Sequence, residues 1–370
     1  MTSAPLIDID SLLQPIPGDD PTGTDIREDY SPSSPYQAVK AARNQARASE
    51  RQSIHDGDSQ EAMEHWNLVI QLAPEIIRDQ AKDLEVASWY AEAMLRRHGF
   101  AGLRDAFKII QNLVDNFWDN LHPMPDEYGM ETRVSCISGL NGEGVEGVLI
   151  APIRKVHLTE GRDPGPFSLW QYQQSLDIQK AQDEPSRQAK IANLGFDTDD
   201  IDKSVAGSSE AFYVNLRDDL EECIDIYKAT GLKLDELCGL DDAPPTRTII
   251  EVLDTCLGTV KHIGKLKFPI ESIEEDTEMD ENTGAGTDTG AVAPKAARSP
   301  IATREEAFKQ LIEIADFFRK TEPHSPVSYV LQKAVKWGNM PLGDLIQELI
   351  PDSSSREHFS ELTGVEGNEE

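Results

Sequence analysis

Apolar residues recur at helical spacing along most of this chain of 370 residues, and the pattern is strongest in its first third. In KDLEVASWYAEAMLRRHGF they share one face: Leu84, Ala87, Tyr90, Ala91, Met94 and Leu95. They do so again in the next stretch: Leu103, Ala106, Phe107, Ile110, Leu113, Val114, Phe117 and Trp118. Gly99 allows the left-handed residue that ends many helices, and Pro123 and Pro125 end the second stretch. Because only Phe100 and Ala101 connect the two stretches, the sequence predicts two antiparallel helices.

Helical patterns continue downstream and predict an all-α fold. Ser168 and Gln171 have the spacing of a capping box, in which each side chain bonds the backbone N–H of the other residue. A longer helix is expected to bury one face: Phe212, Leu216, Leu220, Cys223 and Tyr227. A last helix follows the two prolines of DDAPPTRTIIEVLDTCLGTVKHI. We therefore expect a helical N-terminal domain over residues 1–160, irregular at its start, and a helical middle domain over residues 161–268.

The composition changes sharply after residue 268. Eight acidic residues fall between Glu271 and Asp288, and Gly, Ala, Thr and Pro dominate the residues after them. Such a segment buries too little apolar surface to offset the entropy lost on ordering. Residues 269–302 are therefore predicted to be a flexible acidic linker.

Helical patterns resume in residues 303–370. Thr303 and Glu306 have the spacing of a capping box, and Ile314 and Phe317 widen the apolar stripe of the helix that begins there. Further stripes predict three more helices, with these members: Val327, Val330, Leu331, Ala334 and Val335; Leu342, Leu345, Ile346 and Leu349; Phe359 and Leu362. A module this small buries a modest fraction of its surface, so surplus apolar residues predict self-association. The alternative is that Ile314 and Phe317 pack beneath the terminal helix.

The stretch RKTEPHSPVSYV places a histidine near two serines, as a catalytic cluster would. Pro323 ends one helix, however, and Ser325 and Pro326 suit the N-cap and the first position of the next. His324 has no acidic or nucleophilic partner fixed by the pattern. The stretch is therefore predicted to be a helix turn.

The charge balance excludes several classes of partner. The chain has 35 basic and 67 acidic side chains and a formal net charge of −32, so phosphate backbones and anionic lipid surfaces are repelled. No apolar run is long enough to span a membrane, and MTSAPLIDIDSLL lacks the basic start of a signal peptide. We expect a cytoplasmic protein that neither binds nucleic acid nor inserts into a membrane.

The sequence motifs do not predict an enzyme. GEGVEG, residues 142–147, has the letters of a dinucleotide-binding loop without the preceding strand, and is predicted to be a plain loop. GFDTDDIDKS departs from a calcium loop at Ile201 and Asp202, so its aspartates are expected to cap a helix. The cysteines lack metal or disulfide spacing and are predicted to be reduced: Cys136, Cys223, Cys238 and Cys256. We expect no catalytic residue, cofactor or metal, although a carboxylate pair formed only on folding would escape this reasoning.

The same first-third stretch resembles the signature of the ImpA N-terminal domain family. The matching residues are Lys82, Asp83, Leu84, Trp89, His98, Gly99, Phe100, Trp118, His122 and Pro123. Upstream, GDDPTGTDIRED and YQAVKAAR resemble the entry of that family, so the resemblance covers roughly residues 15–160. TREEAFKQLIEIADFFRKTEPHSPVSYVLQKAVKWGNMPLGDLIQELIP is similar to the C-terminal part of the shorter TssA proteins of the bacterial type VI secretion system.

The resemblance implies a cytoplasmic, non-enzymatic scaffold in a contractile injection machine. Proteins of this family are associated with the baseplate and with assembly of the tail tube and sheath. Their C-terminal module forms a ring from which the N-terminal domains radiate. Longer members cap the distal end of the sheath and carry a larger C-terminal region, so a baseplate-linked role is favoured over a distal cap. The expected partners are other copies of the chain and the baseplate, tube and sheath proteins.

Six residues of the C-terminal module are candidates for the ring interface or the module's own core: Phe308, Ile314, Phe317, Phe318, Val330 and Trp337. At least half are expected in the core, because apolar stripes usually face their own domain. Another class of function stays open, namely a monomeric helical adaptor or chaperone that binds partner peptides in a groove. The two differ in oligomeric state, since the scaffold requires residues 300–370 to assemble.

Overall fold

The computed structural model describes residues 2–56, 60–181, 183–239, 241–269, 304–321, 327–338, 340 and 345. The chain divides into two compact units, residues 1–275 and residues 276–370. Every regular element in the described part is a helix, as predicted, and β-type pairing there consists of isolated bridges.

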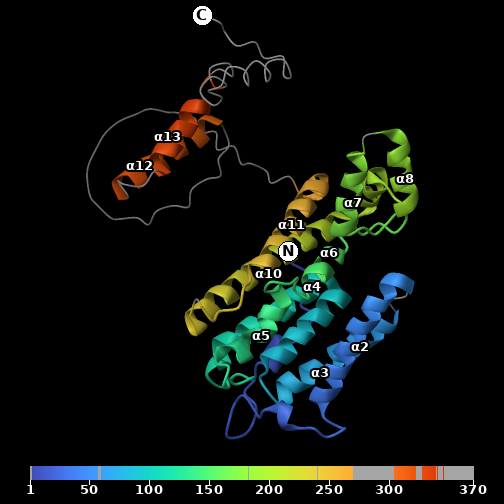
Figure 1. The fold of residues 1–370 in the computed structure, drawn as a ribbon, viewed down its shortest axis with the longest axis vertical. Helices are drawn as coiled ribbons and strands as arrows, with labels where there is room; N and C mark the ends of the chain where they lie inside the picture. The colour runs from blue at the N-terminus through green and yellow to red at the C-terminus, as the bar shows by residue number, and fades with distance from the viewer. Residues whose placement is uncertain are drawn as a thin grey trace, which may run out of the picture. The chain divides into compact units, whose positions relative to one another are not determined.

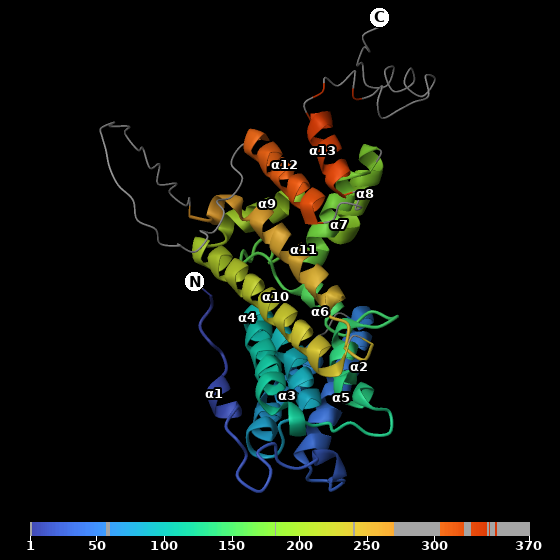
Figure 2. The same cartoon turned by 90° about the vertical axis from the view of Figure 1, so that its left-hand side faces the viewer.

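Figures 1 and 2 show the helices of the first unit from two directions. In chain order they are α1 (Ile9–Leu12), the 3-10 helix η1 (Ile26–Glu28), α2 (Pro35–Asp56), α3 (Gln60–Asp79), α4 (Leu84–Phe117), η2 (Trp118–Asn120), α5 (Met130–Asn141), α6 (Ile150–Lys155), α7 (Leu169–Gln179), α8 (Glu184–Leu194), α9 (Thr198–Gly207), α10 (Glu210–Cys238), α11 (Arg247–Ile263) and η3 (Lys265–Lys267). The helices α2 and α3, for which the apolar pattern gave no separate prediction, pack beside α4.

The strongest apolar pattern forms α4, which is interrupted at Gly99. Gly99 has φ 60° and ψ −143°, a backbone conformation that residues with a Cβ rarely adopt. The two segments run antiparallel, because the N–H of Leu84 at the start donates to the carbonyl of His122 just past the end, at 2.8 Å. Gly102 allows their close approach, since an added Cβ would lie 2.4 Å from the carbonyl oxygen of Met94. The predicted antiparallel pair is confirmed.

Helix α10 packs along α4, and α11 packs on α10. The rings of Phe107 in α4 and Tyr227 in α10 stack with their centroids 4.6 Å apart. The predicted apolar face of α10 is buried except for Phe212, which is half-buried. A continuous core runs from Leu12 to Val260. Helices of both predicted domains therefore share one core, and the boundary at residue 160 stays a prediction.

The expected local signals appear where helices begin. Ser168 and Gln171 form the predicted capping box of α7. Asp197 caps α9 and, as predicted, belongs to a helix start; its capping-box partner is Asp200. Residues 142–147 form a loop between α5 and α6, again as predicted.

The second unit contains two described helices, α12 (Arg304–Thr321) and α13 (Val327–Gly338), which pack against each other. The ring of Phe308 in α12 lies against Gly338, where an added Cβ would meet its Cζ atom at 2.2 Å. Ala315 and Val335 are buried. The predicted linker after residue 269, the cap at Thr303, the turn at residues 322–326 and the helices predicted beyond residue 341 lie outside the described residues.

Candidate functional site

The first residues of the family-like signature have structural roles. Lys82 is fully buried, and its Nζ donates to the carbonyls of Leu12 at 2.7 Å and Ile77 at 2.8 Å. Asp83 caps α4 by accepting from the N–H of Val86 at 2.9 Å and pairs with Arg27 at 2.7 Å. These two side chains therefore tie the N-terminal segment to the start of α4, while Leu84 lies in the core.

The aromatic residues of the signature also serve packing. Trp89 stacks on Tyr36 with ring centroids 5.6 Å apart. The guanidinium of Arg133 lies 4.9 Å from the centre of the Trp118 ring, and it donates to the carbonyls of Trp118 at 2.8 Å and Pro123 at 3.2 Å. His122 is buried, and neither of its ring nitrogens has a hydrogen-bond partner among the described residues. This end of α4 is thus held in place by α5.

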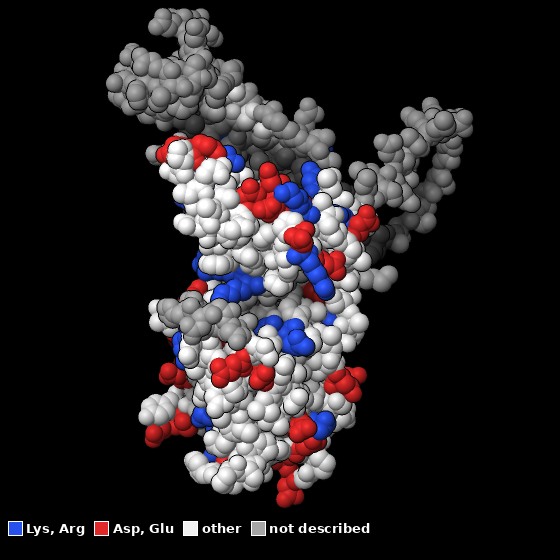
Figure 3. Space-filling view, turned by 90° about the vertical axis from the view of Figure 1, so that its right-hand side faces the viewer, with Lys and Arg blue, Asp and Glu red and all other residues white. Residues whose placement is uncertain are grey.

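The remaining signature residues, His98, Gly99 and Phe100, lie at the turn of α4 and line a pocket of about 1040 Å³. We call it the Gly99 pocket. Its other walls come from four chain segments: residues 47–51 of α2, residues 62–66 of α3, residues 147–160 around α6 and residues 209–219 of α10. Figure 3 shows Lys and Arg side chains gathered around the hollow on this face.

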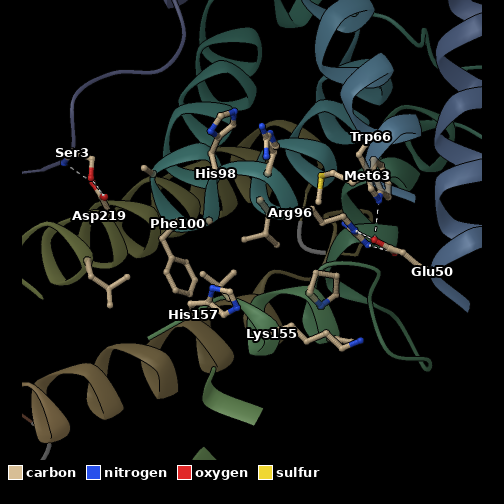
Figure 4. A pocket seen from close by; sticks show the side chains of 18 of the residues that line it. Ser3, Glu50, Met63, Trp66, Arg96, His98, Phe100, Lys155, His157 and Asp219 are labelled. Carbon is tan, nitrogen blue, oxygen red and sulfur yellow. Dashed lines mark hydrogen bonds and ion pairs between the residues drawn. The ribbon is translucent and has the colours of Figure 1, made fainter. Parts of the chain in front are cut away.

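Figure 4 shows how the side chains meet in this pocket. Arg96 and His98 come from the end of the first α4 segment, and Lys155 and His157 face them from the α6 side. Apolar side chains form part of the lining, with Phe100 buried and Met63 and Phe212 half-buried. The pocket therefore combines a basic rim with apolar contact surface.

The ion pair between Arg96 and Glu50 fixes the wall between α2 and α4. Arg96 Nε lies 2.5 Å from Glu50 Oε1, and its guanidinium lies 4.3 Å from the centre of the Trp66 ring. Trp66 in turn donates its indole N–H to Glu50 at 2.8 Å. The carboxylate of Glu50 is consequently occupied from two sides.

The other two carboxylates that line the pocket are also engaged. Glu160 accepts hydrogen bonds from the backbone N–H of Ser209 at 3.2 Å and from its hydroxyl at 2.9 Å, beside the start of α10. Asp219 is buried and pairs with Arg104 at 2.5 Å, while the backbone N–H of Ser3 donates to it at 3.0 Å. Asp219 is therefore neutralised by Arg104, whereas Glu160 keeps its charge and is held at the start of α10.

Four basic side chains of the lining have no ion-pair partner in the described part of the chain: Arg47, Arg51, Arg97 and Lys155. Arg51, Arg97 and Lys155 are exposed, whereas Arg47 is half-buried. Burial lowers the pKa of Arg47, Glu92 raises it, and the neighbouring arginines lower it further. Partial burial, and then the charge of Arg97, also lower the pKa of His98. The uncompensated charge in this pocket is therefore positive.

The sequence prediction missed this site. Its signal is the spacing of Arg43, Arg47 and Arg51, which puts three arginines on one stripe of α2. Arg43 pairs with Glu92 at 2.6 Å, and this contact orients the stripe toward α4. Residues from four distant segments complete the pocket, and no local sequence pattern predicts that they come together.

The six candidate residues of the C-terminal module lie in the second unit. Phe317 and Val330 are 60% and 61% exposed, and Ile314 is 38% exposed. Phe308, Phe318 and Trp337 are half-buried, with Lys333 Nζ 4.9 Å from the centre of the Trp337 ring. Their assignment to core or interface stays a prediction.

No three His, Cys, Asp or Glu side chains in the described part of the chain are grouped as metal ligands would be. None of the helices described there is long and apolar enough to cross a membrane. The described residues define an all-helical protein that has a pocket with a basic rim.

Comparisons with known proteins agree with this class. A family model described as ImpA, N-terminal, type VI secretion system, matches residues 13–142. A curated protein of Pseudomonas aeruginosa, the type VI secretion system component TssA1, is 24% identical over 98% of this chain and 99% of its own length. A solved structure from Burkholderia cenocepacia, the N-terminal domain including the conserved ImpA_N region of the TssA component, covers 72% of this chain and 98% of its own. Its TM-score is 0.59 and its sequence identity 25%.

Residues 13–142 thus match the ImpA N-terminal family, and the chain is similar to a TssA component of a type VI secretion system over nearly its full length. The predicted resemblance is confirmed, and it supports a role in a type VI secretion system.

Proposed function

We propose that this chain is a structural component of a bacterial type VI secretion system and acts there as a homo-oligomeric scaffold. Residues 303–370 of several copies join into a ring, and the helical arms formed by residues 1–268 project from it. The ring associates with the baseplate and supports assembly of the tail tube and sheath. The observation that carries this proposal is the likeness to TssA1 over almost the full length of both chains.

Exposed apolar side chains on α12 and α13 support self-association. They are Ile312 at 44%, Ile314 at 38%, Phe317 at 60%, Tyr329 at 62% and Val330 at 61% exposed. Several exposed apolar side chains on a small helical unit favour a protein interface. Association would remove it from water and gain roughly 25 cal/mol for each Å² buried.

We propose two roles for the six candidate residues, guided by their burial. Phe308 packs against Gly338 and is assigned to the contact between α12 and α13. Ile314, Phe317 and Val330 are the more exposed and are assigned to the interface between copies. Phe318 and Trp337, both half-buried, contribute to either surface.

Light scattering after size exclusion tests the proposal on the full chain, whose single-copy mass is 41.0 kDa. The test variant combines Ile314→Ser, Phe317→Ser and Val330→Ser. The matched control combines Tyr128→Ser, Leu232→Ser and Leu266→Ser, at positions in the first unit that are 71%, 67% and 93% exposed. Both variants remove three exposed apolar side chains.

We expect the unmodified chain and the control to form one large closed oligomer, and the test variant to fall toward 41.0 kDa. An unmodified chain that runs at the single-copy mass would refute the scaffold and favour the monomeric adaptor. A test variant that keeps the full oligomer would place the interface elsewhere.

A further inference from the structure

We propose that the Gly99 pocket is a docking site for an acidic peptide segment of a partner protein, held by ion pairs at the rim and by apolar side chains within. The proposal rests on the scaffold function for its biological setting, because it gives the projecting arm a surface with which to bind a component of the machine. The binding chemistry itself follows from the pocket.

Positive charge is left uncompensated in the pocket. Its three carboxylates are already bonded within the fold, Glu50 to Arg96, Asp219 to Arg104 and Glu160 to Ser209. Four basic side chains around it have no such partner among the described residues, and three of them are exposed. In a chain with a formal net charge of −32, this local excess of positive charge selects for an anionic ligand.

The arrangement of the basic groups favours a chain of carboxylates over a single phosphate group. A phosphate group is favoured where free N–H groups at a helix N-terminus converge on it. Of the helices that begin at this pocket, α10 has its start already engaged, because Glu160 accepts the backbone N–H and hydroxyl of Ser209, which caps it. The basic groups come instead from α2, α4 and α6, and they are spread along the rim. Such spacing suits several carboxylates on a chain better than one compact phosphate.

Apolar side chains form part of the pocket lining. Phe100, Met63 and Phe212 border the same cavity as the basic rim. Its volume of about 1040 Å³ lies at the upper end of the range for small-molecule pockets, roughly 300–1,000 Å³. A peptide that places apolar side chains inward and carboxylates outward matches both kinds of surface.

Long polyanions fit this pocket poorly. A nucleic acid strand extends beyond any one pocket and would meet the acidic remainder of the protein, which repels it. A short acidic segment stays within the rim. Exposed ion pairs are individually weak, so binding depends on several of them acting with apolar contacts.

Fluorescence anisotropy with the full chain tests the proposal at low ionic strength. The probe is a fluorescein-labelled peptide of glutamate residues interrupted by leucine and phenylalanine. One comparison peptide replaces each glutamate by glutamine, and another replaces each apolar residue by glycine. A single-stranded oligonucleotide with the same number of charges represents the nucleic acid class.

The pocket variant combines Arg51→Gln, Arg97→Gln and Lys155→Gln, all at exposed positions. The matched control combines Lys180→Gln, Arg187→Gln and Lys203→Gln, whose side chains near α7 to α9 are at least half exposed. Both variants remove three positive charges, so the control measures how much binding depends on charges outside the pocket.

We expect the pocket variant to weaken binding of the acidic probe by about tenfold or more and the control by less than about twofold. Both comparison peptides should bind more weakly than the probe. Equal losses in the two variants, absence of saturable binding, or tighter binding of the oligonucleotide would each overturn the proposal. These outcomes are separate from the light-scattering result, because peptide binding to the first unit does not require an oligomer.

Discussion

The buried lysine at the start of the family signature gives the sharpest test of this structure. Lys82 is fully buried, and its charged Nζ is held by the carbonyls of Leu12 and Ile77. The substitution Lys82→Met keeps most of the apolar stem and removes the charge. The effect of this substitution on the free energy of unfolding should depend on pH, and that dependence reports on the ammonium group of Lys82 alone.

Burial lowers the pKa of Lys82 from 10.5 to about 8, partly opposed by the charge of Asp79. Above pH 8 the folded protein therefore binds fewer protons at this site than the unfolded chain does. One pKa unit corresponds to about 1.4 kcal/mol, so the whole shift is worth roughly 3.4 kcal/mol. This contribution is fully present above pH 10.5 and is lost as the pH falls to 8. Between pH 7 and pH 10 the unmodified chain should gain about 2.5 kcal/mol relative to Lys82→Met.

The assay is urea unfolding followed by tryptophan fluorescence at several values between pH 7 and pH 10. Subtracting the variant from the unmodified chain cancels the titration of the other lysines, tyrosines and cysteines. Lys228→Met, at an exposed position in α10, is the matched control. A Lys82→Met difference that is flat, or that falls as the pH rises, would refute the assignment of a desolvated ammonium at this site.

Two further predictions concern the stability of the first unit. Arg104→Met should lower the free energy of unfolding of this unit by about 3–5 kcal/mol in urea unfolding, because it leaves the buried carboxylates of Asp105 and Asp219 without their shared cation. A loss below about 1 kcal/mol would contradict the buried network. Gly99→Ala should lower the same free energy by about 1–3 kcal/mol, because Gly99 has φ 60°. The control is Gly139→Ala in α5, where an added Cβ meets nothing within 4 Å; it should leave the free energy of unfolding unchanged or slightly raised. Equal losses in the two alanine variants would argue against strain at Gly99.

Several parts of the fold were predictable because their causes are local in the sequence. The helical spacing of apolar residues located α4, α10 and α11, and Gly99 marked the reversal within α4. The caps at Ser168 and Asp197 depend on residues only three positions away. Helix α2 was harder to predict, because it is rich in polar and charged residues, whereas α3 has an apolar stripe that the prediction did not use.

The Gly99 pocket forms only when distant segments of the chain pack together in the tertiary structure. His98 and Phe100 belong to the family signature, yet their place in a pocket depends on a segment that extends to Asp219, about 120 residues further along the chain. Which charges stay uncompensated is also a long-range outcome, because Glu50 could neutralise Arg47 or Arg51 on its own helix and instead pairs with Arg96 of α4. The sequence by itself determined the all-helical class, the helix ends and the acidic net charge, since spacing and composition suffice for these. The folded arrangement determined the basic pocket, because an ion pair forms between the side chains that packing brings together, whatever their separation along the chain.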